Sequence, residues 1–226
     1  MNHFGFRDAT GKILFSLKDC SITVNQPNVV GNILEEWLAQ WMTDHNIEHI
    51  HNKAQESPDF WLNPENLYDD WLEVKSFTGS PNFDIAAYRS FISLIVEKPY
   101  KLQSSYLLIK YVMENGIVRI ENCWLKKVWE ICSSSTKWAL KVQDKRGVIN
   151  NIRPATWYSD RTDFKPFNCL EDFIAALEET IYRYHDTHHL ADNWERRLVD
   201  SYEKFYGVRL RIPRWMDIKE QYERNR

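Results

Sequence analysis

Hydrophobic side chains recur at helical spacing early in the chain, between residues 28 and 45. The side chains that would share one face of a helix there are Val30, Leu34, Trp37, Leu38 and Trp41. Pro27 stands at the start of this stretch, as is common where helices begin. Three further helices are predicted at about 84–97, 170–185 and 192–206, and the first of them stops before Pro99.

Shorter apolar or alternating segments predict β-strands. They lie at residues 12–17, 20–24, 57–62, 71–77, 106–113, 117–124, 138–142 and 148–152. Asn115-Gly116 favours a tight hairpin turn, because both residues readily adopt positive φ, and residues 144–147 mark a second hairpin. This order of elements predicts an α/β protein with a mixed central β-sheet flanked by helices.

The composition is that of an ordinary globular protein, with 226 residues of which 43% are hydrophobic. No repeat or linker interrupts it, so we expect a single domain over residues 1–226. No apolar run approaches the roughly 20 residues that cross a bilayer, and no secretory signal pattern is present, so we expect a cytoplasmic protein without a membrane partner. The four cysteines lack C-x-x-C spacing, which favours reduced thiols, and the lack of a glycine-rich phosphate loop argues against a nucleotide cofactor.

Charge is distributed unevenly along a chain whose net charge is −3. Acidic residues outnumber basic ones in residues 1–99, whereas basic residues outnumber acidic ones in 137–165 and 204–226. The basic segments suit contact with phosphates, and the acidic part suits divalent cations. Solvated surfaces of no special function would give the same clusters.

Two apolar strand-like segments contain charged residues that a buried strand disfavours. Asp59 follows Pro58 in one segment, and Glu73 and Lys75 lie in the other. Alternation along a strand puts Glu73 and Lys75 on the same face, and pairing of the two strands would bring Asp59 beside Glu73. Two carboxylates together are hard ligands of the kind that Mg²⁺ binds, with Lys75 placed to orient water and stabilise charge.

This pattern of Pro-Asp, a gap and Glu-x-Lys resembles the PD-(D/E)xK nuclease superfamily, over a catalytic core of about residues 28–113. The resemblance implies a restriction-endonuclease-like core in which Asp59 and Glu73 hold Mg²⁺ and Lys75 assists hydrolysis of a DNA phosphodiester. It also implies a further catalytic, metal-binding carboxylate from the preceding helix, for which Glu35 is the first candidate and Glu36 the second.

Within the superfamily, the size and the lack of an added domain resemble a type II restriction endonuclease. Such an enzyme is expected to cut double-stranded DNA as a homodimer, and residues 114–226 would supply DNA recognition and dimerisation. The segment 152–157, Ile-Arg-Pro-Ala-Thr-Trp, resembles the group that includes NgoBV and NlaIV, which implies a GGNNCC target.

Three other interpretations stay open at this point. The protein could be a repair or junction-cleaving nuclease of the same fold, or a non-catalytic DNA-binding regulator. Alternatively, Glu73 and Lys75 could form an ordinary ion pair on an exposed strand, with Asp59 capping a turn. Clustered charge in apolar strands favours a functional site over this last interpretation.

Several polar residues are candidates for DNA contact, because arginine, lysine and asparagine reach base edges and phosphates. Those on the second predicted hairpin are Lys145, Arg146, Asn150, Asn151 and Arg153. Arg209, Arg211 and Arg214 alternate like one exposed face of a strand and could touch phosphates, and Tyr88 and Arg89 are weaker candidates. His185, His188 and His189 have zinc-like spacing without a fourth ligand, so we interpret them as residues near a helix C-terminus.

Overall fold

The structure is a computed structural model that describes residues 5–54, 56–159 and 161–223. The chain forms two compact units that alternate along the sequence. The first contains the chain up to Pro81 together with Ser104–Lys126, and the second contains Asn82–Gln103 and the chain from Lys127 onward. The expectation that residues 1–226 act as a single nuclease domain stays a prediction.

The first unit is built on a mixed six-stranded sheet in the order β1-β9-β8-β6-β5-β4. The strands are β1 (Thr10–Lys12), β4 (Ile50–His51), β5 (Phe60–Trp61), β6 (Trp71–Phe77), β8 (Ser105–Glu114) and β9 (Ile117–Lys127). β6 pairs in parallel with β8 and antiparallel with β5, so it lies inside the sheet with neighbours on both sides. The predicted mixed sheet is therefore confirmed.

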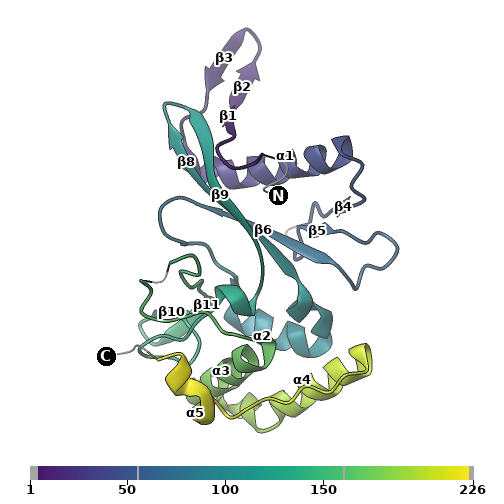
Figure 1. The fold of residues 1–226 in the computed structure, drawn as a ribbon, viewed down its shortest axis with the longest axis vertical. Helices are drawn as coiled ribbons and strands as arrows, with labels where there is room; N and C mark the ends of the chain where they lie inside the picture. The colour runs from purple at the N-terminus through teal and green to yellow at the C-terminus, as the bar shows by residue number, and fades with distance from the viewer. Residues whose placement is uncertain (1–4, 55, 160, 224–226) are drawn as a thin grey trace. The chain divides into compact units, whose positions relative to one another are not determined.

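Helix α1 (Val30–Asp44) packs on one face of this sheet, as Figure 1 shows. Val30, Leu38 and Met42 of the helix are buried together with Leu72 and Val74 of β6. The apolar face predicted from the sequence thus meets the sheet. Burial of these side chains fixes the position of β6 and of the polar residues that alternate with Leu72 and Val74.

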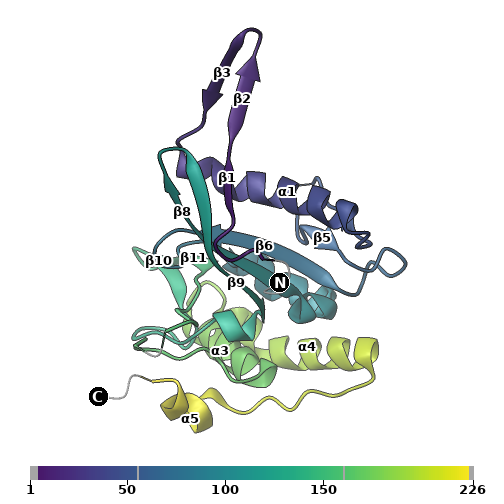
Figure 2. The ribbon, with the colours of Figure 1, turned by 45° about the horizontal axis from the view of Figure 1, so that its top comes forward.

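The hairpin formed by β2 (Leu14–Leu17) and β3 (Cys20–Thr23) extends away from α1 and from the strands of the sheet, as Figures 1 and 2 both show. All eight of its strand residues are exposed. Its base lies against the β8–β9 turn, where Gly116 has a φ of +75° and a side chain at that position would collide with Thr23. Asn115 also has positive φ, as the predicted tight turn requires.

The second unit combines helices with a small sheet in the order β10-β11-β7. Its elements are β7 (Ala86–Ala87), α2 (Tyr88–Glu97), β10 (Val142–Lys145), β11 (Val148–Ile152), α3 (Leu170–Arg183), α4 (Ala191–Tyr206) and α5 (Trp215–Ile218), with short 3-10 turns between them. The buried indole of Trp194 donates a hydrogen bond of 2.8 Å to the Ile92 carbonyl and so ties α4 to α2. In the described part of the chain, no helix has the length and apolar character needed to cross a membrane.

Several predicted boundaries were wrong. The strand predicted at 57–62 is reduced to Phe60–Trp61, and the one predicted at 138–142 is replaced by β10, which begins only at Val142. The helix predicted from residue 84 begins at Tyr88, because Ala86 and Ala87 first pair with β11. For Ala86 and Ala87 the pairing partner, β11, is distant in sequence and leaves no local signal.

Candidate active site

The antiparallel pairing of β5 with β6 positions Asp59 beside the predicted motif. Phe60 pairs with Leu72 and Trp61 with Trp71, so Asp59, just before β5, comes level with Glu73. The backbone N–H of Val74 donates a hydrogen bond of 2.6 Å to Asp59 Oδ2 and anchors this carboxylate on β6. The register of this strand pair therefore brings the two acids together.

Lys75 points to the same place as the two acids. Its Nζ lies 3.5 Å from Glu73 Oε2 and 4.0 Å from Asp59 Oδ2. Leu72 and Val74 face the core beneath α1, so alternation directs Glu73 and Lys75 to the opposite face of β6. The predicted convergence of Asp59, Glu73 and Lys75 is what the structure shows.

These three charges lie in a largely desolvated setting. Glu73 is only 4% exposed. Burial, followed by the charge of Glu73, raises the pKa of Asp59 from its ordinary 3.8 to about 6. The Lys75 ammonium and the Val74 hydrogen bond lower the pKa of Asp59 but do not cancel the increase. Two carboxylates held together against their own repulsion form a site that a cation would stabilise.

Two further residues support the acids and were missed by sequence reasoning. The Ser57 hydroxyl donates a short hydrogen bond to Glu73 Oε1, which orients that carboxylate. His51 on β4 lies 3.2 Å from Glu35 Oε1 through Nε2, and its ring stacks on Phe60. Ser57 stands beside the Pro-Asp pair and could have been noticed there. His51 gave no signal, because its place depends on packing between β4 and α1.

The predicted third carboxylate, Glu35, lies on α1. It contacts His51, and its charge contributes weakly to the raised pKa of Asp59. Glu36 is farther out, with its carboxylate 4.0 Å from His51 Nδ1 and 69% of its side chain exposed. The structure therefore favours Glu35 over Glu36, and the role of Glu35 as a metal ligand stays a prediction.

The donor set suits Mg²⁺ in its usual protein coordination. Within residues 5–54, 56–159 and 161–223, no three His, Cys, Asp or Glu side chains group closely enough to hold a metal ion by themselves. Mg²⁺ commonly takes only one or two carboxylates and completes its shell with waters and substrate phosphates. The adjacent carboxylates of Asp59 and Glu73 fit that requirement.

Most of the predicted DNA contacts lie on or near the β10–β11 hairpin of the second unit. Lys145, Arg146 and Asn150 are exposed, and Arg146 has a φ of +56° in the turn. Asn151 and Arg153 instead bind the carboxylate of Asp84, which leaves them less available than the tip residues. The tip of the hairpin is therefore the stronger candidate for reading or holding DNA.

The C-terminal arginines are exposed, but they do not form the face of a strand that their spacing resembled. The described chain from Val208 to Pro213 forms neither helix nor strand. Arg209 pairs with Asp200 and Glu203 of α4, and Arg214 pairs with Asp217. Arg211 is exposed in the same irregular segment. Alternation cannot form a strand unless a neighbouring strand accepts its backbone hydrogen bonds.

The remaining candidates outside the motif have structural contacts in the second unit. Tyr88 is fully buried, and its hydroxyl lies 3.4 Å from the Thr187 hydroxyl, which removes it from the candidates for DNA contact. Arg89 pairs with Asp186. His185 Nε2 lies 3.0 Å from the same aspartate, and His188 contacts the Tyr182 carbonyl, so both side chains have local partners.

The mixed sheet with Asp59, Glu73 and Lys75 at its β5–β6 pair has the layout of a nuclease of the restriction-endonuclease class. A solved structure titled NlaIV restriction endonuclease superposes with a TM-score of 0.93 and 41% identity, over 99% of this chain and 93% of the other. The type II restriction enzyme NlaIV of Neisseria lactamica is 43% identical over 96% of this chain and 91% of its own length.

A second relative and a family profile agree with this assignment. The type II restriction enzyme NgoBV of Neisseria gonorrhoeae is 37% identical over 61% of this chain and 81% of its own length. The profile of the NgoBV restriction endonuclease family matches residues 1–222. The chain therefore belongs to the NgoBV restriction endonuclease family, and the α/β fold and the resemblance drawn from the motif are confirmed.

Proposed function

We propose that this type II restriction endonuclease hydrolyses phosphodiester bonds in double-stranded DNA at specific sites, with Asp59, Glu73 and Lys75 as its catalytic residues. One observation carries the assignment of residues. Lys75 Nζ lies within 4.0 Å of both carboxylates on two paired strands, in a chain of a restriction endonuclease family. An ion pair on an exposed strand would not bury Glu73 to 4% exposure or raise the pKa of Asp59 to about 6.

Mg²⁺ is the cofactor that these acids suit. Asp59 and Glu73 would hold it, and Glu35 is the further carboxylate that we predict to contribute. When bound there, Mg²⁺ supplies positive charge that offsets the phosphate and makes a water molecule more acidic. Ser57 contributes by holding Glu73 in one orientation, as partners of metal-binding carboxylates commonly do.

The protein side chains act on the nucleophile and on the phosphate. A water oxygen adds to phosphorus, one P–O ester bond breaks, and the departing oxygen gains a proton. Lys75 carries three N–H donors, which can orient the attacking water and stabilise charge on the phosphate oxygens. Its place between the two acids keeps the ammonium close to the reacting phosphate.

Exposed polar side chains and the need to cut two strands support double-stranded DNA as the substrate and a homodimer as the assembly. Lys145, Arg146 and Asn150 at the tip of the β10–β11 hairpin supply exposed donors for phosphates or base edges. One active site cuts one strand, so we propose a homodimer for cleavage of both strands. A DNA substrate agrees with the cytoplasmic location expected from the sequence.

Plasmid cleavage tests this proposal. We expect the purified protein to convert a mapped plasmid into discrete fragments with Mg²⁺ and to be inactive with EDTA. Glu73→Gln and Lys75→Ala should each lower cleavage by about a hundredfold or more. A matched control is Lys110→Ala, since Lys110 also pairs with an acid, Glu121 at 3.0 Å, and has similar exposure. Equal losses in Lys75→Ala and Lys110→Ala would contradict the assignment of Lys75.

The fragment pattern separates this function from its rivals. A restriction endonuclease cuts intact linear duplex at fixed positions, and sequencing of the ends tests the GGNNCC target. A junction-cleaving or repair nuclease would leave intact duplex uncut and would cut branched or mismatched DNA. A non-catalytic regulator would bind DNA equally well with Glu73→Gln and would show no cleavage with any divalent ion.

A further inference from the structure

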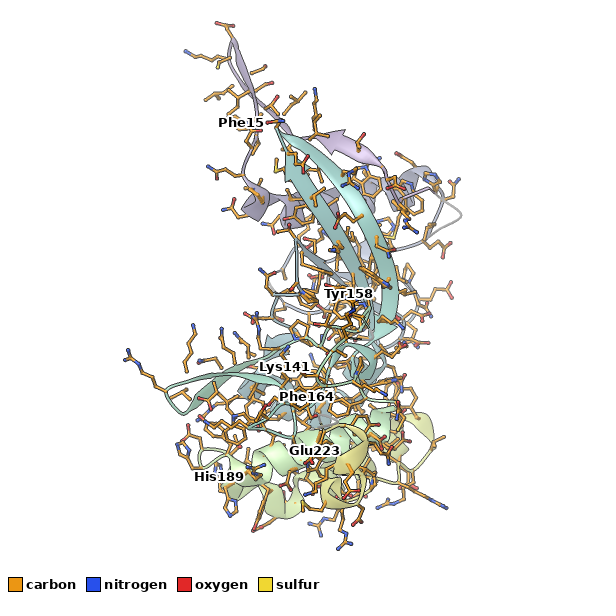
Figure 3. The ribbon with its side chains drawn as sticks, turned by 60° about the vertical axis from the view of Figure 1, so that its left-hand side comes forward. Phe15, Lys141, Tyr158, Phe164, His189 and Glu223 are labelled. Carbon is orange, nitrogen blue, oxygen red and sulfur yellow. The ribbon has the colours of Figure 1, made fainter. Side chains whose placement is uncertain are left out.

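The β2–β3 hairpin exposes an apolar face that the first unit does not cover. Phe15 pairs with Ile22, and Leu17 with Cys20, so alternation puts these four side chains on one side of the hairpin. Phe15 is 54% exposed, Leu17 67% and Ile22 52%. Figure 3 labels Phe15 on this hairpin. Monomeric proteins seldom leave such apolar groups together in water without a partner.

The first unit also contains an apolar cavity of about 190 Å³ between α1 and the strands β1, β8 and β9. Ile33 and Trp37 of α1 line it and are each 43% exposed, while Phe6, Leu107 and Val118 line it and are buried. A cavity of about 150 Å³ with apolar walls can hold a benzene ring, so this one has room for a phenylalanine side chain. An exposed apolar arm and an apolar cavity of matching size thus occur in the same unit.

The hairpin cannot fill the cavity of its own chain without breaking contacts at its base. Val24 N–H donates a hydrogen bond of 2.9 Å to the Ile13 carbonyl, and Thr23 packs directly against the turn at Gly116. Ile13 also lines the cavity, so the arm leaves the unit from the edge of the cavity and extends outward (Figure 2). An arm that begins beside one cavity and reaches away from it is suited to exchange between two copies.

We propose that two copies of this chain associate by exchanging arms, with the Phe15 face of each β2–β3 hairpin docked in the cavity of the other copy. The proposal rests on the proposed function, because cleavage of both strands calls for two active sites. A two-fold axis would make the contact reciprocal, since each copy offers both an arm and a cavity.

The available area suits a dimer. Covering Phe15, Leu17, Ile22, Ile33 and Trp37 would bury roughly 100 Å² each, or about 1,000 Å² of apolar surface over two copies. A standard stable interface buries about 1,200–2,000 Å², including a polar rim. Phosphates call for cations, and Phe15, Leu17, Cys20 and Ile22 carry none, so the chemistry of these four side chains favours a protein partner over DNA.

The molecular mass of the DNA-free protein tests the exchange. Sedimentation equilibrium should give twice the chain mass of 27.1 kDa for the wild type. Phe15→Lys, and independently Leu17→Lys, should weaken the dimer at least tenfold. Leu14→Lys is the matched control, because Leu14 is 67% exposed on the opposite face of the same strand and should leave the dimer intact. Cys20 is an exposed thiol on the docking face, so its alkylation should be slower in the wild type than in Phe15→Lys.

Three results would overturn the exchange. They are a monomeric wild type, a Phe15→Lys protein as dimeric as the wild type, and equal dissociation of Leu14→Lys and Phe15→Lys. Protection of Cys20 only after DNA is added would assign the arm to DNA instead. Plasmid cleavage is scored separately. If the wild type cleaves DNA but Phe15→Lys stays dimeric, only the arm exchange is contradicted. If the wild type dimerises through the arm but never cleaves DNA, only the proposed function is contradicted.

Discussion

Asp59→Asn should make the metal-free protein more stable while it abolishes cleavage. The carboxylate of Asp59 is desolvated and faces Glu73, and both effects disfavour its negative charge. Asparagine has nearly the same shape, and its carbonyl oxygen can still accept the hydrogen bond from Val74. The substitution therefore removes the unfavourable charge with little change in packing, and it removes the ligand that Mg²⁺ needs.

The expected gain follows from the shift in pKa. Asp59 has a pKa of about 6 in the folded protein against an ordinary 3.8, and each unit is worth about 1.4 kcal/mol, which sets an upper limit of about 3 kcal/mol. The side chain is 20% exposed, and solvent screening lowers the gain to about 1–2 kcal/mol. For a chain of this length that is a rise in Tm of about 2–8 °C.

The gain should depend on pH with a fixed sign. Between pH 4 and pH 6 the folded wild type binds a proton at Asp59 that the unfolded chain does not, so wild-type stability rises as pH falls. The advantage of Asp59→Asn is then full at pH 7–8 and lost near pH 4. Glu178, whose pKa burial and Glu195 raise to about 7, also affects wild-type stability, but it is present in both proteins and cancels in the difference.

Urea or thermal unfolding in EDTA at pH 8, 6 and 4.5 measures this difference, with Asp69→Asn as an exposed control. Asp69→Asn should change stability by less than about 0.5 kcal/mol at each pH. The reasoning fails if Asp59→Asn is less stable than the wild type at pH 8, or if its gain is the same at pH 4.5. In Mg²⁺ the stability advantage of Asp59→Asn over the wild type should become smaller, because only the wild type gains stability from the ion.

Three further changes have defined outcomes. Ser57→Ala should raise the Mg²⁺ concentration needed for half-maximal cleavage by about tenfold or more, because Glu73 loses the donor that orients it, which a Mg²⁺ titration of cleavage measures. Gly116→Ala should destabilise the protein by about 1–3 kcal/mol in urea unfolding, because it combines positive φ with a collision against Thr23. Arg146→Ala should weaken DNA binding for every sequence and lower the slope of log affinity against log salt by about 0.9, measured with the inactive Glu73→Gln protein.

Each of these predictions has a control that separates it from a general loss of structure. Gly147 also has positive φ but open space around it, so Gly147→Ala should cost less than Gly116→Ala. Arg196→Ala on the exposed side of α4 should leave the salt slope unchanged. For Ser57→Ala, unchanged unfolding in EDTA together with unchanged Mg²⁺ dependence would show that this hydrogen bond has no role in cleavage.

The central part of the site could be predicted because its geometry is local. The strand Trp71–Phe77 has the bounds that its apolar pattern predicts, and a single antiparallel pairing brings Asp59 level with Glu73. The turn at Asn115-Gly116 is likewise a property of two adjacent residues. Where residues close in sequence determine the structure, the sequence predicts the positions of individual side chains.

The parts that sequence reasoning missed depend on partners far along the chain. His51 reaches Glu35 only because a two-residue strand adds to the edge of the sheet. The spacing of Arg209, Arg211 and Arg214 resembled the exposed face of a strand, yet no strand in the described chain pairs with this segment. The polar and apolar pattern of a segment predicts which of its faces is buried, but it does not predict which other segment packs or pairs with it.

The alternation of the two units along the chain limits how the enzyme can be divided. The parallel strands β6 and β8 belong to the first unit. The segment that connects them, Asn82–Gln103, contains α2 and belongs to the second unit. A protein ending at Lys126 would carry α2 without α4, which packs on it, and without Phe173 of α3, whose ring contacts Phe91. A protein beginning at Lys127 would lack α2. A division of the gene at residue 126 therefore does not separate the two units, because α2 stays with the wrong half.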